Sequence, residues 1–269
     1  MKRWIRISLI ALVVTYVGVL IVGPLVALVF GAFGQGIAAA WQALASPVFF
    51  SAFWRTLWIA VVVVLIHVSF GTAVAWVMVR HRFPGRDLLN GLIDMPFAIS
   101  SVVVGYMLLL LFGRNGLLAP VLASLDIQVA FATPGMILAT LFVTLPFMVR
   151  ELIPVLENFK IEQEQAAATL GAKGWQTFLR VTLPALRWGF IYGISLTFAR
   201  ALGEFGAVLV IGGGIQGRTE TTTLFIFRSL DERMYTAAYS AALALGLLAF
   251  ILVMGTEVVR RIEKNREGD

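Results

Sequence analysis

From Met234 to Thr256 the chain reads MYTAAYSAALALGLLAFILVMGT, without one Asp, Glu, Lys or Arg. Two further stretches, Ile7 to Trp54 and Ile127 to Val149, lack the same four residue types. An α-helix needs roughly 20 apolar residues to cross the hydrocarbon of a bilayer, and each stretch is long enough. These stretches predict an all-α integral membrane protein.

Composition agrees with a membrane environment. Of the 269 residues, 59% are hydrophobic and 13% are charged, and the mean hydropathy is +0.90, far more apolar than a soluble domain. The net charge of +6 does not predict nucleic-acid binding, because the basic residues form short clusters between apolar segments. The chain has no cysteine for a disulfide or thiolate site, and His67 and His81 have no metal-ligand spacing.

Six membrane spans are expected. Their predicted ranges are Ile7 to Phe33, Leu57 to Val79, Met95 to Phe112, Gly135 to Val149, Trp188 to Gly212, and Thr236 to Val259. The first apolar run is too long for the core of a signal peptide, which favours an uncleaved first span. The predicted organisation is a first helix with an outer connection (1–53), a five-helix core containing a polar loop at 157–187 (54–260), and a cytoplasmic tail (261–269).

Basic residues predict the orientation, since Lys and Arg concentrate in cytoplasmic loops. Fifteen of them fall on the side that carries both termini, whereas five fall on the other side. Both termini are therefore expected in the cytoplasm. Among the outer residues, Arg114, Arg218, Arg228 and Arg233 are expected either to be solvated interface charges or to attract an anion or a binding protein.

The predicted cytoplasmic loop contains a polar segment that runs from Glu162 to Pro184. Helix formers up to Leu170, followed by Gly171, predict two short helices joined at a left-handed glycine. The small residues Ala166 to Ala168 leave room for a partner's surface, with Glu162 and Glu164 at its rim, where they are expected to meet a partner's basic side chains. An amphipathic interfacial helix is the alternative, but Glu and Gln dominate the polar face where lipid headgroups favour Lys and Arg. A protein partner is therefore predicted.

The spacing in this segment resembles the signature of permease subunits of binding-protein-dependent ABC importers. The matching residues are Gln165-Ala166-Ala167, Gly171, Val181 and Leu183-Pro184. Gln165 stands where the family usually has Glu, although Glu164 is adjacent, and Val181 stands where it often has Ile. This resemblance implies a type I importer permease fold in which the region around Ala166 to Gly171 is a coupling helix that docks on a cytoplasmic ATPase.

Other runs resemble the sulfate/thiosulfate importer permeases, and the W subunit more than its T partner. They are Arg82-Phe83-Pro84-Gly85-Arg86, Asp94-Met95-Pro96-Phe97-Ala98, Phe147 to Pro154, Gly171 to Trp175, and Ala199 to Ala207. Molybdate permeases share much of this pattern, so molybdate or another oxyanion is the alternative substrate.

The same resemblance implies the rest of the assembly. The expected partners are a second permease of the T type, two ATPase subunits that bind ATP and magnesium, an external sulfate-binding protein and the lipid of a bacterial inner membrane. No lysine of this chain has the Gly-Lys-Ser/Thr context of a phosphate-binding loop, so the chain is not expected to be an enzyme by itself.

Two charges fall inside the fifth expected span. Arg200 and Glu204 are four residues apart, so on a helix they share one face and can pair. A charge within the membrane marks a functional site by default, and the alternatives here are a pathway or gate and a structural lock between helices. Asp94 is expected to be a helix-start residue, and His67 a packed or hydrogen-bonded histidine.

Two other classes of protein are alternatives to an importer permease. An ion-gradient secondary transporter usually keeps carboxylates near the midplane and shows repeat symmetry, whereas here candidate carboxylates are few and no internal repeat is found. A membrane scaffold without transport activity is the second. Neither class explains the signature from Gln165 to Pro184.

Overall fold

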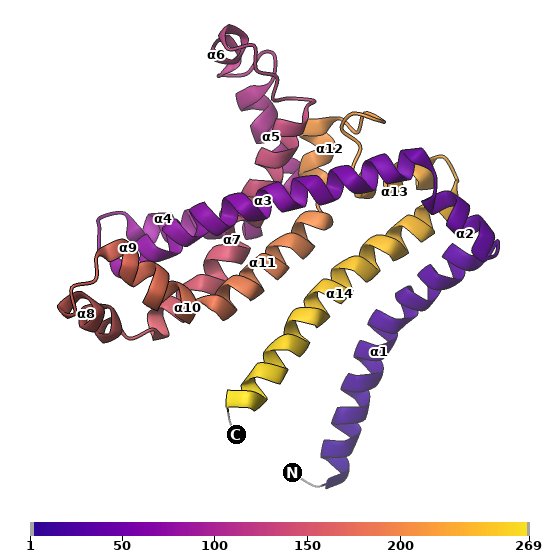
Figure 1. Ribbon diagram of the computed structural model, residues 1–269. Helices are drawn as coiled ribbons and strands as arrows, with labels where there is room; N and C mark the ends of the chain where they lie inside the picture. The colour runs from indigo at the N-terminus through magenta and orange to yellow at the C-terminus, as the bar shows by residue number, and fades with distance from the viewer. Residues whose placement is uncertain (1–2, 268–269) are drawn as a thin grey trace.

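The computed structural model describes residues 3–267, which fold into helices and turns without a strand (Figure 1). Four helices are long and apolar enough to cross a bilayer alone: α1 (Arg3–Phe33), α3 (Pro47–Arg80), α7 (Thr133–Asn158) and α14 (Tyr235–Glu267). Two bent pairs pass the same test together, α4 (Arg86–Ala98) with α5 (Ser101–Phe112), and α11 (Arg187–Leu202) with α12 (Gly206–Gly212). Counting each pair as one span gives six, which confirms the expected all-α membrane fold.

Shorter helices lie at the two ends of these spans. On the expected outer side are α2 (Ile37–Leu44), α6 (Ala119–Ser124) and α13 (Thr222–Asp231). At the other end are α8 (Ile161–Thr169), α9 (Gly174–Thr177), the π-helix η1 (Phe178–Thr182) and α10 (Leu183–Ala185). Figure 1 shows α8 and α9 beside the end of α3, far from α6 and α2.

Several segment boundaries in the structure differ from the predicted ones. The expected outer connection ends early because α3 begins at Pro47, where Ser46 Oγ accepts a hydrogen bond from Phe49 N–H (3.3 Å) and proline occupies the first turn. The boundary proposed at residue 53 therefore falls within a continuous helix. The expected tail is also helical, since α14 continues to Glu267, and residues 268–269 lie outside the described part.

The third and fifth expected spans are broken rather than straight. Ile99 is extended and Ser100 (φ −59°, ψ 137°) is not helical, and the chain turns by 114° between α4 and α5. The break at Gly203 to Phe205 turns the chain by 57° between α11 and α12. Pro96 lacks a backbone N–H, so its helical turn is already missing a hydrogen bond before the first break. These breaks place non-helical backbone within two spans.

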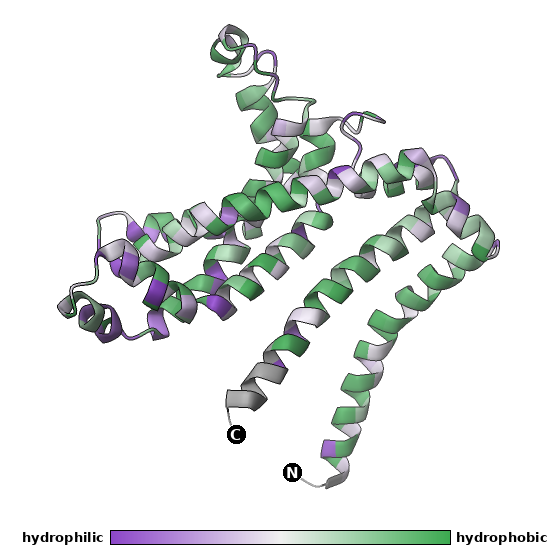
Figure 2. Cartoon of the chain, viewed as in Figure 1, coloured by the Kyte–Doolittle hydropathy of each residue, from purple (hydrophilic) through white to green (hydrophobic). Residues whose placement is uncertain are grey.

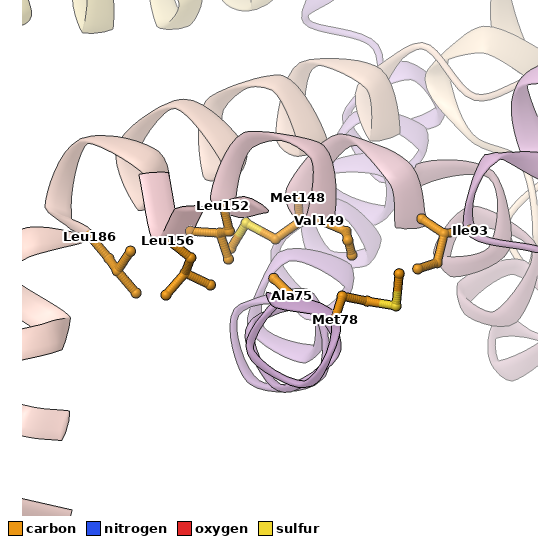
Figure 3. Close-up of a cluster of buried hydrophobic side chains, with 8 residues drawn as sticks. All are labelled: Ala75, Met78, Ile93, Met148, Val149, Leu152, Leu156 and Leu186. Carbon is orange, nitrogen blue, oxygen red and sulfur yellow. The ribbon is translucent and has the colours of Figure 1, made fainter. Parts of the chain in front are cut away.

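The core is built by α3, α7 and α11. One buried cluster joins α3 and α4 to α7 and the start of α11, and its residues are Ala75, Met78, Ile93, Met148, Val149, Leu152, Leu156 and Leu186 (Figure 3). Met148 lies between two glycines: a Cβ at Gly71 would lie 2.9 Å from its Cγ, and one at Gly193 would lie 2.4 Å from its Sδ. An added Cβ at either place would force Met148 to shift, so both glycines let the three helices approach closely.

Helix α1 lies apart from this core, along α14 and α2 (Figure 1). Its contact with α14 includes Gly31, where an added Cβ would lie 2.4 Å from the ring of Tyr239. Figure 2 shows hydrophobic residues along the whole length of α1, whereas hydrophilic residues gather around α8 to α10. The exposed apolar side chains of α1 are suited to contact with lipid. The polar end of the molecule, around α8 to α10, is suited to contact with water.

Candidate functional site

The segment from α8 to α10 has the predicted two-helix form. Helix α8 ends at Thr169, and Gly171 has a φ of +84°, with its N–H donating to Ala168 O (3.0 Å). No atom lies within 4 Å of the place where a Cβ would stand, so glycine is needed here for its backbone conformation alone. The predicted left-handed turn at Gly171 is confirmed.

The exposed surface of this segment is partly apolar, although it lies in the polar end of the molecule. Leu170 is 89% exposed and Trp175 is 61% exposed, and Gln165 and Ala166 are also exposed. Between the two short helices is a depression of about 330 Å³, whose lining includes Ala167, Leu170, Gly171, Gln176, Arg180 and Val181. Exposed apolar side chains around a hollow are typical of a surface that binds another protein.

The remaining signature residues shape the return to the membrane. Val181 belongs to η1, and the N–H of Leu183 donates to the carbonyl of Phe178, five residues back. Pro184 has no N–H for the usual bond four residues back, which favours the wider π-turn. Pro184 lies in the first turn of α10, whereas the longer helix α11 begins at Arg187.

Glu164 points inward rather than to the rim of the surface. Its Oε1 accepts hydrogen bonds from Arg80 Nη2 (3.0 Å) at the end of α3 and from Thr182 Oγ1 (3.1 Å) in η1. The expectation that Glu164 meets a partner's basic side chain is therefore wrong, because its charge is satisfied within the chain. Glu162, two residues earlier, is the exposed acid of α8.

Arg200 and Glu204 do pair, with Arg200 Nη2 lying 2.8 Å from Glu204 Oε2. They are not on one continuous helix, since Glu204 lies past the end of α11. The guanidinium N–H is not aimed at that oxygen, so the contact is ionic rather than a well-aligned hydrogen bond. The side chain of Glu204 is 2% exposed, and its Oε1 accepts from Ala207 N–H (3.0 Å) in the first turn of α12. One carboxylate thus joins both sides of the break.

The two broken spans meet just beyond their breaks. A Cβ at Gly206 would lie 2.4 Å from Ser101 Oγ, and a Cβ at Gly105 would lie 2.8 Å from Ala207 O. Each glycine therefore lets α5 and α12 pack with their backbones almost in contact. The second helices of the two broken spans, α5 and α12, form one paired unit, which sequence reasoning did not predict.

Asp94 has a role that the sequence reading missed. It lies within α4, not at its start, because Gly85 (φ +90°) begins that helix at Arg86. Arg150 of α7 donates to Asp94 Oδ1 (2.8 Å) through Nε and to Asp94 Oδ2 (2.5 Å) through Nη2. A charge at the end of an apolar segment needs a partner, but the sequence alone does not show that Arg150 is the partner of Asp94.

The loop between α12 and α13, on the expected outer side, is held by charges. Arg228 donates to Glu220 Oε1 (2.6 Å) and to Glu232 Oε2 (2.9 Å), and the bond to Glu220 raises the pKa of Arg228 above its ordinary value. From α3, Arg55 donates to the carbonyls of Gly217 (2.8 Å) and Glu220 (2.9 Å). Arg228 is thus a structural residue, whereas Arg114, Arg218 and Arg233 are exposed.

His67 is buried in α3, with its Nε2 lying 3.0 Å from Thr144 Oγ1. Because the Thr144 hydroxyl donates its proton to Thr140 O (2.7 Å), it accepts from His67, which places the proton on Nε2. The expected hydrogen-bonded histidine is confirmed. Within residues 3–267 no group of three or more His, Cys, Asp or Glu side chains could hold a metal ion.

Residues 67–263 match the model of the family described as "Binding-protein-dependent transport system inner membrane component". The chain belongs to this family. The matched residues include α3 from His67, both broken spans and the segment from α8 to α10. They therefore contain most of the site residues described above. Membership and the candidate spans together make the chain a multi-pass membrane protein.

Named relatives within the permease family are similar over most of their length. The "Sulfate transport system permease protein CysW" of Synechocystis sp. is 46% identical over 257 residues, covering 96% of this chain and 93% of the relative. The "Sulfate transport system permease protein CysT" of Escherichia coli is 41% identical over 239 residues, covering 89% and 86%.

A solved structure shares the fold. It is a bacterial alginate ABC transporter in complex with an alginate pentasaccharide-bound periplasmic protein, with a TM-score of 0.79 at 18% identity, covering 97% of this chain and 96% of that chain. The likeness supports the type I importer permease fold.

Proposed function

We propose that this chain is a W-type permease subunit of an ATP-driven importer for sulfate or thiosulfate, forming half of the translocation pathway. The observation that carries this proposal is the segment from α8 to α10, an exposed and partly apolar surface ordered around Gly171 at the polar end of the bundle. Such a surface suits docking by an ATPase, which this chain needs because its sequence lacks a Gly-Lys-Ser/Thr phosphate-binding loop. The chain itself is then a subunit of an ATP-hydrolysing complex rather than an enzyme.

The proposed complex contains four further protein components. One docking segment serves one ATPase, so two ATPase subunits, with ATP and magnesium, require a second permease. The similarity to both CysW and CysT proteins favours a related T-type chain in that place. An external binding protein completes the complex, as the alginate transporter structure illustrates for its own substrate.

The proposed orientation places both termini and the segment from α8 to α10 in the cytoplasm of a bacterial cell. It rests on the bias of fifteen basic residues against five, since Lys and Arg concentrate in cytoplasmic loops. The outer side then carries α6, α13 and the loop held by Arg55 and Arg228.

Arg200 and Glu204 are proposed as a gate within the pathway. Arg200 is partly exposed at a break in a span, where its guanidinium can attract an oxyanion, and Glu204 neutralises it in the structure described. Exchange of Glu204 for a passing dianion would open the contact between α11 and α12. Backbone N–H groups at such breaks can also favour an anion transiently.

The complex of this chain with the T-type permease, the ATPase and the binding protein, reconstituted in proteoliposomes, tests this function. We expect uptake of labelled sulfate that requires ATP, with excess molybdate competing weakly. If molybdate competes more strongly than thiosulfate, molybdate would be assigned as the substrate instead. Uptake driven by an ion gradient without ATP would contradict an ABC importer.

A further inference from the structure

Three parts of the cytoplasmic end meet at one carboxylate oxygen. Glu164 Oε1 accepts from Arg80, the last residue of α3, and from Thr182 in η1. The side chains of Arg80 and Glu164 are only 12% and 15% exposed. An ion pair withdrawn from water in this way is screened much less than a surface pair, and it holds its partners in one geometry.

Aromatic rings enclose the Arg80 guanidinium as well. Its central carbon lies 5.6 Å from the ring centroid of Trp76 and 5.8 Å from that of Phe159, within the range of cation–π attraction. The Trp76 ring meets Phe178 of η1 edge-on at 5.5 Å. Arg80 and Trp76, one helical turn apart on α3, therefore contact the chain just before α8, α8 itself, and the start of η1.

Helix α8 otherwise packs mainly against α9 and η1, which belong to the same short segment. Most of its other side chains, Gln165 and Ala166 among them, are exposed, as is Glu162. The ionic link between α8 and a membrane-spanning helix goes through Glu164. A displacement of α8 by a bound partner would thus act on α3 at Arg80.

The opposite end of α3 holds the outer loop. Arg55 donates to the carbonyls of Gly217 and Glu220, in the loop between α12 and α13. Arg55 and Arg80 are separated by about 37 Å at the 1.5 Å rise of an α-helix. Because α3 is one continuous helix with proline only at its first turn, it can move as a rigid body between these two arginine contacts.

We propose that the Arg80–Glu164 pair transmits movement of the segment from α8 to α10 to α3, and through Arg55 to the outer loop. This inference rests on the proposed function, because it supposes that an ATPase moves that segment. Arg80 and Glu164 are positioning residues: they contact neither the substrate nor, in this account, the ATPase.

The first test compares Glu164→Gln with Glu162→Gln in the reconstituted complex, measuring sulfate moved per ATP hydrolysed. Loss of the Glu164 charge should lower this ratio about tenfold while the ATPase stays bound, and the exposed Glu162 control should stay within about twofold of the unmodified complex. Equal ratios for the two variants would overturn the proposal. Release of the ATPase by Glu164→Gln would also overturn it, because Glu164 would then belong to the docking surface.

The second test switches the link on and off in one protein, so that a folding defect cannot mimic the result. The chain has no cysteine, and the double variant Arg80→Cys/Glu164→Cys can be joined by a bifunctional thiosulfonate reagent that reductant removes. We expect a low ratio of sulfate to ATP in the unlinked variant, recovery on cross-linking and loss again on reduction. The cysteine-free chain, treated identically, controls for reaction with other subunits. An unchanged ratio after cross-linking would contradict transmission through this pair.

The two hypotheses fail in different ways. If the unmodified complex takes up no sulfate with ATP, the proposed function fails, whatever the variants do. If the unmodified complex transports sulfate and the Glu164 variants match it, the proposed function stands and the transmission role of Arg80 and Glu164 is wrong.

Discussion

Arg150 binds Asp94 through one edge of its guanidinium, with Nε donating to Oδ1 at 2.8 Å and Nη2 donating to Oδ2 at 2.5 Å. Arg150 Nη2 also donates to Asn90 Oδ1 (2.8 Å). Asn90 and Asp94 are one turn apart on α4, so a single arginine of α7 fixes α4, the first helix of the broken third span. Both side chains of the ion pair are a third or more exposed, and solvent weakens the attraction.

A double-mutant cycle measures the coupling free energy between Asp94 and Arg150. Asp94→Asn and Arg150→Gln should each lower the free energy of unfolding by about 1 kcal/mol, because a two-point charged contact is stronger than an ordinary exposed pair. Thermal unfolding of the purified chain in detergent provides the measurement. The double variant should cost less than the two single changes summed, and simple additivity would show that the contact contributes nothing.

The close approach of α5 and α12 predicts that adding a side chain at Gly105 lowers the stability of the chain. Gly105→Ala should destabilise the chain by about 1–3 kcal/mol, because the added Cβ would lie 2.6 Å from Val210 Cβ and 2.8 Å from Ala207 O. Gly91→Ala is the matched control, since Gly91 is also inside a helix and has no atom within 4 Å of the new Cβ. The control should be neutral or slightly stabilising. Equal melting temperatures for the two variants would contradict the tight packing of α5 on α12.

The ion pair at the break near Glu204 predicts that its two single variants lose different amounts of stability. Arg200→Gln leaves a buried charge and should cost about 3–5 kcal/mol, whereas Glu204→Gln keeps an oxygen that accepts from Ala207 N–H and should cost less. The loss of stability in the double variant should be closer to the loss in Glu204→Gln than to the sum of the two single losses. Melting temperatures of all four proteins test this. A cost for Arg200→Gln no larger than that for Glu204→Gln would show that Glu204 does not depend on its partner.

Orientation is tested by labelling single cysteines in a chain that has none of its own. Lys173→Cys and Arg218→Cys both place a thiol at an exposed position, on opposite sides of the expected membrane. An impermeant maleimide added outside intact cells should label only the Arg218 variant. Labelling of both from outside would overturn the proposed orientation and the six-span topology.

The sequence predicted the spans because charge-free runs such as Met234 to Thr256 need no tertiary information. It did not predict the bends, which depend on contacts between segments far apart, such as Gly206 against Ser101. Periodicity also could not tell which acid of α8 turns inward. Glu164 does so because Arg80, 84 residues earlier, lies beneath it. Asp94 was missed for the same reason, as its partner lies 56 residues away.

Coupling of ATP hydrolysis to transport through the segment from α8 to α10 is most directly tested at Gly171. Gly171→Val should disrupt the left-handed turn, because a β-branched residue strongly disfavours a φ of +84°. Gly171→Asn is the matched control, since Asn tolerates this conformation and no neighbour crowds the site. We expect the Val variant alone to lose ATP-dependent sulfate uptake and stimulation of ATP hydrolysis by the loaded binding protein. Normal uptake and stimulation with Gly171→Val would contradict the account.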